Sequence, residues 1–239
     1  MTGDNFNRAR ISVLGESFST EGVGGLNERS LHKILKLALE PRAEYHEVRY
    51  LGSIADIKNE EGIFEIQTKI AYKLLPKLQR FLLHERVTLV IPIIEEKYVT
   101  YLEESGMSKP RKSPKAENVY TALSSVAFAS TLLRNDKFSI MLVYLCADEY
   151  KYRVKKRGQR KIDVIPSRLL RTELISSPCD VIKYFPAGLS EEFVATEFSR
   201  AIKKPSRFTY FVIKFFESLG FIEEIGMRGR AKLYKIKDK

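Results

Sequence analysis

The sequence is poor in the side chains that build disulfide frameworks and zinc sites. Its 239 residues include two cysteines, Cys146 and Cys179, three histidines and no tryptophan. Two cysteines do not make a disulfide scaffold or a zinc ribbon, and three scattered histidines do not predict a multi-histidine metal site. No apolar run approaches the length needed to cross a bilayer, and the N-terminus lacks a signal-peptide pattern. We therefore expect a soluble, cytoplasmic protein with no membrane partner.

Positive charge is unevenly distributed along the chain. Lysine and arginine total 41 against 30 acidic residues, which gives a net charge of +11. Residues 1–150 contain 20 residues of each sign, so the whole excess lies in residues 151–239. Such a basic region is typical of proteins that bind a polyanion, most commonly nucleic acid, although a purely solubilising face would have the same composition. The asymmetry predicts a neutral N-terminal domain and a basic C-terminal domain.

The order of the predicted elements in the first part of the chain favours an α/β fold. Residues 1–25 are polar and glycine-rich, which predicts a flexible arm. The domain over 26–150 is then predicted to begin with a helix over 26–39 and strands over 46–50, 53–58 and 63–68. A helix over 70–85, broken near Pro76, follows. The remaining elements are strands over 87–94 and 98–102, a helix over 117–134 and a strand over 138–147. The near-continuous apolar run over 87–94 indicates a strand that is covered on both faces. We expect a mixed sheet flanked by helices.

Three acidic residues line up across the three short strands when the strands are paired as tight hairpins. A turn at Leu51–Gly52 makes Glu47 face Asp56, and a loop centred on Glu60–Glu61 makes Asp56 face Glu65. The same pairing makes the opposite face apolar throughout, as a core face should be. The sequence therefore predicts a row of three carboxylates on one face of the sheet.

Carboxylates this close together repel one another unless a cation compensates them. Mg²⁺ or Mn²⁺ suits carboxylate oxygens, and the lack of nearby cysteine argues against zinc. The alternative is a solvated outer face on which Arg49 and Lys58 neutralise the acids. Two further residues are expected near the row. Gln67 is two positions beyond Glu65 on the same face, and Glu28 lies on the preceding helix, one turn before His32.

Residues 26–94 resemble the PD-(D/E)XK nuclease superfamily in this order of elements and in the placement of the acids. Asp56 in Ala-Asp-Ile matches the strand aspartate, Glu65-Ile66-Gln67 matches the acid-x-lysine tripeptide, and Glu28 matches the helix acid. The resemblance implies a restriction-endonuclease-like mixed sheet. It also implies Mg²⁺ or Mn²⁺ held by Asp56, Glu65 and the Ile66 carbonyl, with support from Glu28 or Glu47. The activity implied is metal-dependent hydrolysis of phosphodiester bonds.

The sequence departs from the superfamily pattern at Gln67, which stands where a lysine is usual. An amide can orient a water or a phosphate, but it carries no positive charge and does not act as a base. A lysine at another position is one solution, and Lys69 and Lys73 are the nearest candidates. Two functions therefore stay open: a metal-dependent DNA endonuclease, and a non-catalytic DNA-binding regulator with a degenerate nuclease-like domain. RNA is a further possible substrate.

The last part of the chain is predicted to be a helical unit followed by a hairpin. Residues 151–188 are predicted to be a basic linker. Its first part, 151–161, is expected to be an exposed strand or linker, and Leu169, Leu170, Leu174 and Ile175 indicate a helix. A helix capped by Ser190 is expected to run to Ile202, and a second helix spans Ser206–Leu219 and ends at Gly220. Strands over 221–225 and 231–236 then flank a basic tip at 226–230.

Residues 189–239 resemble the winged-helix family in this helix–turn–helix–hairpin order. The resemblance implies that the helix over 206–219 enters a major groove of duplex DNA and that the hairpin contacts the backbone. Base reading would depend on Arg207 and Tyr210. The residues expected to contact DNA are Lys203, Lys204, Ser206, Arg207, Tyr210, Lys214, Arg228 and Arg230. A winged helix used for protein contacts is the alternative, and a homodimer is expected if both strands of a duplex are cut.

Overall fold

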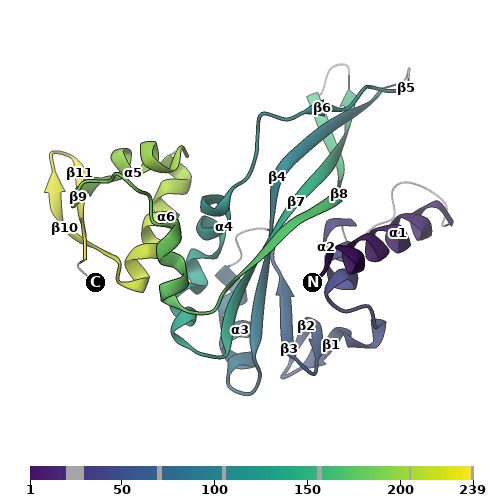
Figure 1. Ribbon diagram of the computed structural model, residues 1–239, viewed down its shortest axis with the longest axis horizontal. Helices are drawn as coiled ribbons and strands as arrows, with labels where there is room; N and C mark the ends of the chain where they lie inside the picture. The colour runs from purple at the N-terminus through teal and green to yellow at the C-terminus, as the bar shows by residue number, and fades with distance from the viewer. Residues whose placement is uncertain (20–29, 69–71, 104–105, 155–157, 205, 238–239) are drawn as a thin grey trace.

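The computed structural model describes all residues except 20–29, 69–71, 104–105, 155–157, 205 and 238–239. It has a large mixed sheet flanked by helices and a small second sheet formed by the C-terminal part of the chain (Figure 1). The predicted α/β class is therefore confirmed at this level. None of the helices in the described part of the chain has both the length and the apolar composition that crossing a membrane would require.

The large sheet has the strand order β1-β2-β3-β4-β7-β8. Its strands are β1 (His46–Tyr50), β2 (Ser53–Asn59), β3 (Gly62–Ile66), β4 (Val87–Glu103), β7 (Phe138–Val154) and β8 (Gly158–Ile175), with β5 (Gly106–Met107) and β6 (Arg111–Lys112) paired to β4. The first three strands form an antiparallel meander, whereas β3–β4 and β4–β7 are parallel and β7–β8 is antiparallel. Val48 pairs with Ala55 and Ile57 with Phe64, so both predicted hairpin registers are confirmed.

The first residue of β3 is a glycine for a steric reason. Gly62 has φ +127°, and a Cβ there would lie 2.5 Å from the Arg86 carbonyl oxygen. That same oxygen accepts a 2.9 Å hydrogen bond from the Ile63 N–H. The close approach fixes the start of β3 against the start of β4, two strands that are separated by a whole helix in the sequence.

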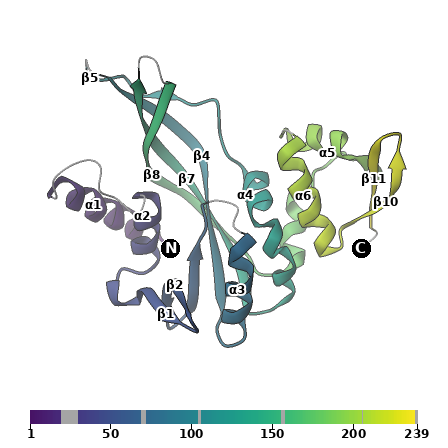
Figure 2. The same cartoon turned by 180° about the vertical axis from the view of Figure 1, so that it is seen from behind.

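Helices cover both faces of the large sheet (Figures 1 and 2). These elements are α1 (Gly3–Ser19), α2 (Ser30–Leu39), η1 (Ala43–Tyr45), η2 (Tyr72–Leu74), α3 (Leu75–Leu82), α4 (Val119–Val126), η3 (Ala127–Arg134) and η4 (Pro178–Tyr184). The helices α1 and α2 enclose one hydrophobic cluster with Val90 and Val143 of the sheet. On the other side, α3 and α4 enclose a second cluster with Leu89 and Leu142. Adjacent residues of β4 and β7 thus belong to different clusters, as the alternation of side chains along a strand requires.

The N-terminal region is more ordered than the sequence predicts. A flexible arm is expected over 1–25, but residues 3–19 form α1, and residues 20–25 lie outside the described part of the chain. Phe6, Ala9 and Val13 are buried against α2. These three residues follow a helical spacing, but the polar residues and glycines around them conceal the pattern.

The helix predicted within the linker over 151–188 is wrong, whereas the described residues of 151–161 do lie in strands. Here β7 extends to Val154, and residues 158–175 form β8 of the large sheet rather than a helix. Leu145 pairs with Leu169 while Tyr144 pairs with Arg171, so a β-bulge at Leu170 shifts the alternation of side chains. This shift breaks the period of two in the sequence and imitates a helical pattern. The separately predicted strands over 87–94 and 98–102 are likewise one strand, β4, with an irregularity between Ile94 and Glu96.

The C-terminal elements follow the expected order of two helices and a hairpin, with a short strand added before them. They are β9 (Glu192–Val194), α5 (Ala195–Ile202), α6 (Ser206–Leu219), β10 (Ile222–Arg228) and β11 (Ala231–Ile236), and the small sheet has the order β10-β11-β9. Ser190 does not cap α5. Residues 192–194 pair with β11 instead, and the helix begins after Val194, whose N–H donates to Glu197 Oε2 at 2.7 Å.

The C-terminal unit, residues 189–237, packs firmly against the large-sheet part of the molecule. Ser130 Oγ of η3 lies 2.6 Å from Ser218 Oγ of α6, and the Arg134 guanidinium donates to the Leu219 carbonyl at 3.2 Å. Leu142 of β7 and Phe198 of α5 belong to the same hydrophobic cluster. The two parts therefore share a core.

A buried carboxylate, Glu40, connects the end of α2 to the strands that follow it. Glu40 is 3% exposed and accepts hydrogen bonds from the Arg42 N–H at 3.0 Å, from Arg42 Nε at 2.9 Å and from Asn59 Nδ2 of β2 at 2.9 Å. The bonds from Arg42 outweigh the effect of burial and lower the pKa of Glu40 from 4.5 to about 2. This network fixes the beginning of the meander relative to α2.

We expect Glu40→Gln to lower the free energy of unfolding at pH 7 by about 1–3 kcal/mol, because the amide loses its charge-assisted bonds to the half-exposed Arg42. The folded-state pKa lies below the ordinary value, so this stabilisation is present above pH 4.5 and is lost as the pH falls towards 2. Urea denaturation at pH 7 and pH 3 measures the difference at each pH. Glu44→Gln, at an exposed position, is the matched control. A difference that is equal at both pH values would contradict this role for Glu40.

Candidate functional site

Asp56 and Glu65 meet where β2 and β3 separate. The last ladder pair of the two strands is Ile57↔Phe64, immediately before these acids. Beyond it, Asp56 Oδ2 accepts the Ile66 N–H at 2.7 Å, and the Asp56 N–H donates to Glu65 Oε1 at 3.3 Å. Side chains thus replace the ladder hydrogen bonds at this point, and they hold two carboxylates beside each other.

A lysine from α3 contacts the buried member of the pair. Lys77 Nζ donates to Glu65 Oε2 at 2.7 Å, and the Glu65 side chain is 4% exposed while that of Lys77 is 21% exposed. Pro76 lies at the first turn of α3 and breaks the predicted helix in two, so Lys77 begins a new helical segment directed at the sheet. The sequence analysis did not identify Lys77, although its helix was predicted.

A histidine from α2 contacts the other carboxylate. His32 Nε2 lies 3.2 Å from Asp56 Oδ2, so helices from both sides of the sheet reach the same pair of acids. The placement of His32 beside the site agrees with its position on the first helix. Asp56 Oδ2 therefore has two partners, whereas Asp56 Oδ1 has none among the described residues.

The environments of the two carboxylates move their pKa values in opposite directions. Burial and the neighbouring Asp56 charge raise the pKa of Glu65 from 4.5 to about 7, despite the hydrogen bond from Lys77. Burial acts on Asp56 in the same sense. The hydrogen bond to His32 and the Ile66 N–H outweigh it, so the pKa of Asp56 lies below its usual value. Burial therefore disfavours the charged form of Glu65, whereas hydrogen bonds favour the charged form of Asp56.

Glu47 does not join the pair, although it occupies the predicted register. Its backbone has φ +52°, which interrupts the β1–β2 ladder at this residue. Its carboxylate contacts Lys36 Nζ at 2.5 Å and is 56% exposed. The predicted row of three carboxylates is therefore a pair, because the left-handed conformation turns Glu47 away.

The other predicted residues near the row are placed as follows. Gln67 directly follows β3, is half-buried, and donates its backbone N–H to the Val90 carbonyl of β4 at 2.9 Å. Lys73, one candidate for the missing lysine, is exposed in η2. Glu28 and Lys69 lie outside the described residues.

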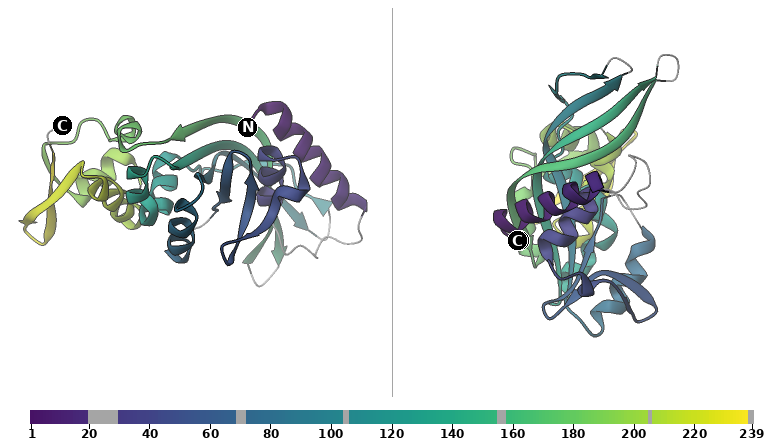
Figure 3. Two further views of the ribbon diagram at one scale, coloured as in Figure 1. Left: turned by 90° about the horizontal axis from the view of Figure 1, so that it is seen from below. Right: turned by 90° about the vertical axis from the view of Figure 1, so that its right-hand side faces the viewer.

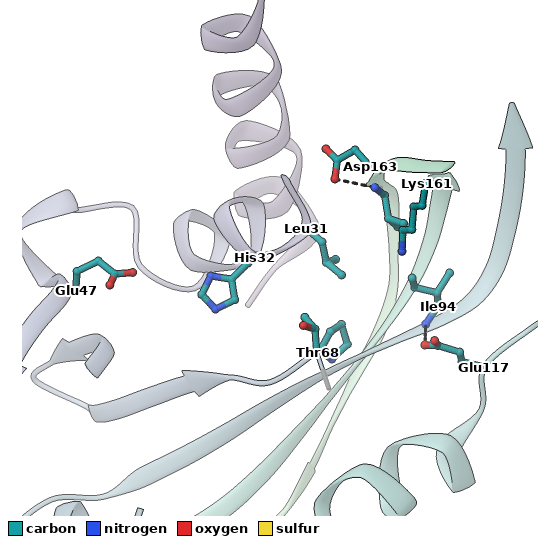
Figure 4. Close-up of a pocket in the computed structure, with 10 residues that line it drawn as sticks. Leu31, His32, Glu47, Thr68, Ile94, Glu117, Lys161 and Asp163 are labelled. Carbon is teal, nitrogen blue, oxygen red and sulfur yellow. Dashed lines mark hydrogen bonds between the residues drawn. The ribbon is translucent and has the colours of Figure 1, made fainter. Parts of the chain in front are cut away.

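A cavity of about 600 Å³ opens beside the acids (Figure 4). His32 and Glu47 line one end of it, and Lys161 and Asp163 of β8 line the other. Thr68 and Glu117 lie between them, and Glu117 accepts the Ile94 N–H at 2.9 Å. His32 both lines this cavity and contacts Asp56, so it lies between the cavity and the carboxylate pair.

The site offers two carboxylates and one carbonyl to a divalent cation of the Mg²⁺ or Mn²⁺ type. Within the described residues, no three His, Cys, Asp or Glu side chains gather as a metal-binding group. Mg²⁺ is commonly held by one or two carboxylates, with waters completing its shell. Asp56 and Glu65 supply two carboxylates. The Ile66 carbonyl faces the same side as its N–H, towards Asp56, because both groups of one residue in an extended strand point the same way.

Several residues expected to contact DNA are engaged within the protein. Lys204 Nζ donates to the Ala116 carbonyl at 3.4 Å, and burial lowers its pKa. Lys214 Nζ contacts Glu217 Oε2 at 2.6 Å. Arg228 belongs to β10 rather than to the hairpin tip, and its guanidinium lies 3.4 Å from Glu197.

The remaining residues of that group are exposed or lie outside the description. Lys203 ends α5 with φ +52° and is exposed, as are Tyr210 and Arg230. Arg230 follows Gly229 at the turn between β10 and β11. The side chains of Ser206 and Arg207 lie outside the described part of the structure.

Comparison with known proteins gives one match. Residues 29–175, which contain the large sheet and both carboxylates, match the family model described as "Domain of unknown function (DUF8091)". Neither the curated proteins nor the solved structures contain a match to this chain.

We expect the Lys77–Glu65 pair to stabilise the fold measurably. Lys77→Met would leave the Glu65 carboxylate buried beside Asp56 without its cation, at a cost of about 1–3 kcal/mol in the free energy of unfolding at pH 8. The double variant Lys77→Met/Glu65→Gln should recover most of that loss, because it removes the buried charge as well. Urea denaturation in chelator measures the cycle, with Lys73→Met as the matched control at an exposed lysine. Additive effects of the two single changes would show that the pair is not coupled.

Proposed function

The chain belongs to the DUF8091 family, and we propose that it is a metal-dependent nuclease that hydrolyses phosphodiester bonds of DNA. The observation that carries the proposal is the meeting of Asp56, Glu65 and Lys77 at the point where β2 and β3 separate. The element order α2–β1–β2–β3–α3–β4 also matches the helix–three-strand–helix–strand order of the PD-(D/E)XK superfamily core. The large mixed sheet is then of the restriction-endonuclease-like type.

The residues that would hold Mg²⁺ or Mn²⁺ are Asp56, Glu65 and, through its carbonyl, Ile66. Such an ion, when bound, lowers the pKa of a coordinated water and neutralises charge that develops on the phosphate. Asp56 keeps one oxygen, Oδ1, without a partner among the described residues, so it offers a donor without breaking a hydrogen bond. Burial, and after it the Asp56 charge, disfavours the ionised form of Glu65, and a bound cation would favour that form.

Lys77 supplies the positive charge that Gln67 lacks. Its ammonium is fixed by Glu65 at 2.7 Å and lies on the sheet side of α3. Beside a phosphodiester, an ammonium in this position would hold a phosphoryl oxygen and stabilise the added negative charge. His32 contacts Asp56 from the opposite helix and keeps that carboxylate oriented, which is a positioning role.

A plasmid cleavage assay tests the proposal directly. The full chain is incubated with supercoiled plasmid, linear duplex, branched DNA or RNA, with Mg²⁺, Mn²⁺ or chelator. We expect cleavage only with metal, and a loss of about 100-fold or more for Asp56→Asn, Glu65→Gln and Lys77→Met, since each contributes at least about 3 kcal/mol to the transition state. Glu96→Gln, at a half-buried glutamate that pairs with Arg168 at 3.7 Å, is the matched control.

A binding measurement separates loss of metal from loss of folding. Mn²⁺ titration by calorimetry should show a site in the wild type that Asp56→Asn weakens, while thermal unfolding shows that the variant is folded. Absence of cleavage of every substrate with both metals would overturn the nuclease proposal. In that case a non-catalytic DNA-binding protein with a degenerate nuclease-like domain would be the better description.

The C-terminal unit is proposed to be a winged-helix DNA reader. The supporting observations are the element order β9–α5–α6–β10–β11 and the exposed cations at Lys203 and Arg230. Both lie at turns, Lys203 between the two helices and Arg230 between the two strands of the hairpin. Contacts from such positions to phosphates would orient the unit on a duplex.

We expect Lys203→Ala and Arg230→Ala each to weaken duplex binding several-fold and to reduce the slope of log K against log salt by about 1. Arg228→Ala should have a smaller effect, because its guanidinium already contacts Glu197. Fluorescence anisotropy in chelator, over a series of salt concentrations, measures both quantities. Lys137→Ala, an exposed lysine before β7, is the matched control. If Lys203 and Arg230 behave like this control, the C-terminal unit does not bind DNA through its turns.

A further inference from the structure

Much of the basic excess lies in the sequence segment that includes the last two strands of the large sheet. Residues 151–175 contain nine basic and two acidic residues, whereas residues 176–239 contain 12 basic and eight acidic residues. The described residues of the first segment form the end of β7 and the whole of β8, and residues 155–157 between the two strands lie outside the description. The charge asymmetry that predicts a polyanion partner therefore indicates the sheet at least as strongly as the C-terminal unit.

Lys151, Arg153, Arg160 and Lys161 of this segment lie on a projecting part of the sheet, here called the ribbon arm. It consists of β5, β6 and the distal described parts of the three long strands: residues 97–103 of β4, 148–154 of β7 and 158–163 of β8. The pairing of β3 with β4 ends at Val90, so the arm extends past the meander (Figures 1 and 3). It projects on the side of the molecule away from the C-terminal unit (Figure 1).

One face of the ribbon arm carries converging lysines. Glu149 is 6% exposed, and its carboxylate lies 3.2 Å from Lys97 Nζ, 3.6 Å from Lys151 Nζ and 3.8 Å from Lys161 Nζ. Three ammonium groups from β4, β7 and β8 therefore surround one carboxylate. The buried acid holds these lysines together on one face of the arm.

A hollow of about 270 Å³ continues this face towards the edge of the arm. Arg111, Lys112, Lys115 and Lys151 line it together with Tyr101, and none of its lining residues is acidic. Arg111, Lys112 and Lys115 are exposed, and none of the three forms an ion pair within the part of the chain that the structure describes. Three exposed cations around one hollow, with no acidic residue among its described lining, attract an anion.

The basic face connects with the cavity beside the carboxylate pair. Lys161 lines that cavity at the end opposite His32 (Figure 4). Lys161 is the ladder partner of Lys151, and Lys151 is the ladder partner of Tyr101. Lys161 and Lys151 therefore form a basic track from the edge of that cavity, which Glu47, Glu117 and Asp163 also line, to the hollow at Arg111 and Lys112.

We propose that this track binds the sugar–phosphate backbone of the nucleic acid whose phosphodiester enters the Asp56–Glu65 site. The inference rests on the proposed function for its substrate, but the binding itself is independent of catalysis. Cations carried by paired strands suit a repeating phosphate chain. Tyr101 offers a ring beside the hollow, and the Arg153 guanidinium lies 4.7 Å from the centre of that ring. The arm thus orients the strand, while the carboxylates act on it.

Charge reversal at the two ends of the same long strands tests the inference. The arm variant is Arg111→Glu/Lys112→Glu on β6. The control variant is Arg86→Glu/Lys137→Glu, one arginine and one lysine, both exposed, immediately before β4 and β7. Both variants change the net charge equally, and thermal unfolding verifies that both fold. Labelled duplex and single-stranded DNA of one sequence and length are titrated with the full chain in chelator, where no metal-dependent cleavage occurs.

We expect the arm variant to bind at least one of the two DNA forms about tenfold more weakly at 100 mM salt, with a salt slope reduced by about 2. The control variant should retain wild-type affinity within about twofold. Equal effects of the two variants, or no effect of the arm variant on either DNA form, would overturn the proposal. A wild type that cleaves no substrate would overturn the nuclease assignment alone, because the binding comparison needs no cleavage.

Discussion

The structure of the site depends on the burial of two like charges side by side. Asp56 and Glu65 face each other across the point where β2 and β3 separate, and an unpaired carboxylate in such surroundings is costly. Three groups from separate elements reduce the cost: the Ile66 N–H of β3, His32 of α2 and Lys77 of α3. The pair is thus possible only because helices cover both faces of the sheet at this position.

The hairpin registers could be predicted because short turns determine them locally. Leu51 and Gly52 both have positive φ, as a tight two-residue turn requires, and the pairing of β1 with β2 follows from that turn. Lys77 could not be predicted in the same way. Its distance from Glu65 depends on how α3 packs on the sheet, and Pro76 alone does not determine that orientation. Glu47 shows the converse, because its register is as predicted but its local conformation removes it from the pair.

The elements that were mispredicted are those whose pattern depends on distant partners. Phe6, Ala9 and Val13 are too few to predict α1 without α2 to bury them. The bulge at Leu170 is defined by the pairing of β8 with β7. Without that partner, the sequence pattern of β8 resembles that of a short helix. In each case, tertiary packing determines secondary structure that local composition leaves ambiguous.

The rigid connection between the two basic regions constrains how the protein would act on DNA. The C-terminal unit shares a hydrophobic core with the large sheet and is hydrogen-bonded to it at Ser130–Ser218 and Arg134–Leu219. The two parts are therefore not independent domains joined by a linker. A duplex held by the C-terminal unit would therefore meet the carboxylate pair at a fixed separation along its axis. The ribbon arm projects away from the C-terminal unit (Figure 1), so backbone contacts at the arm would be separate from those of the C-terminal unit. Holding the strand at two separate places would position the phosphodiester by geometry rather than by diffusion, and this is the contribution that a two-carboxylate site with few ligands of its own most needs.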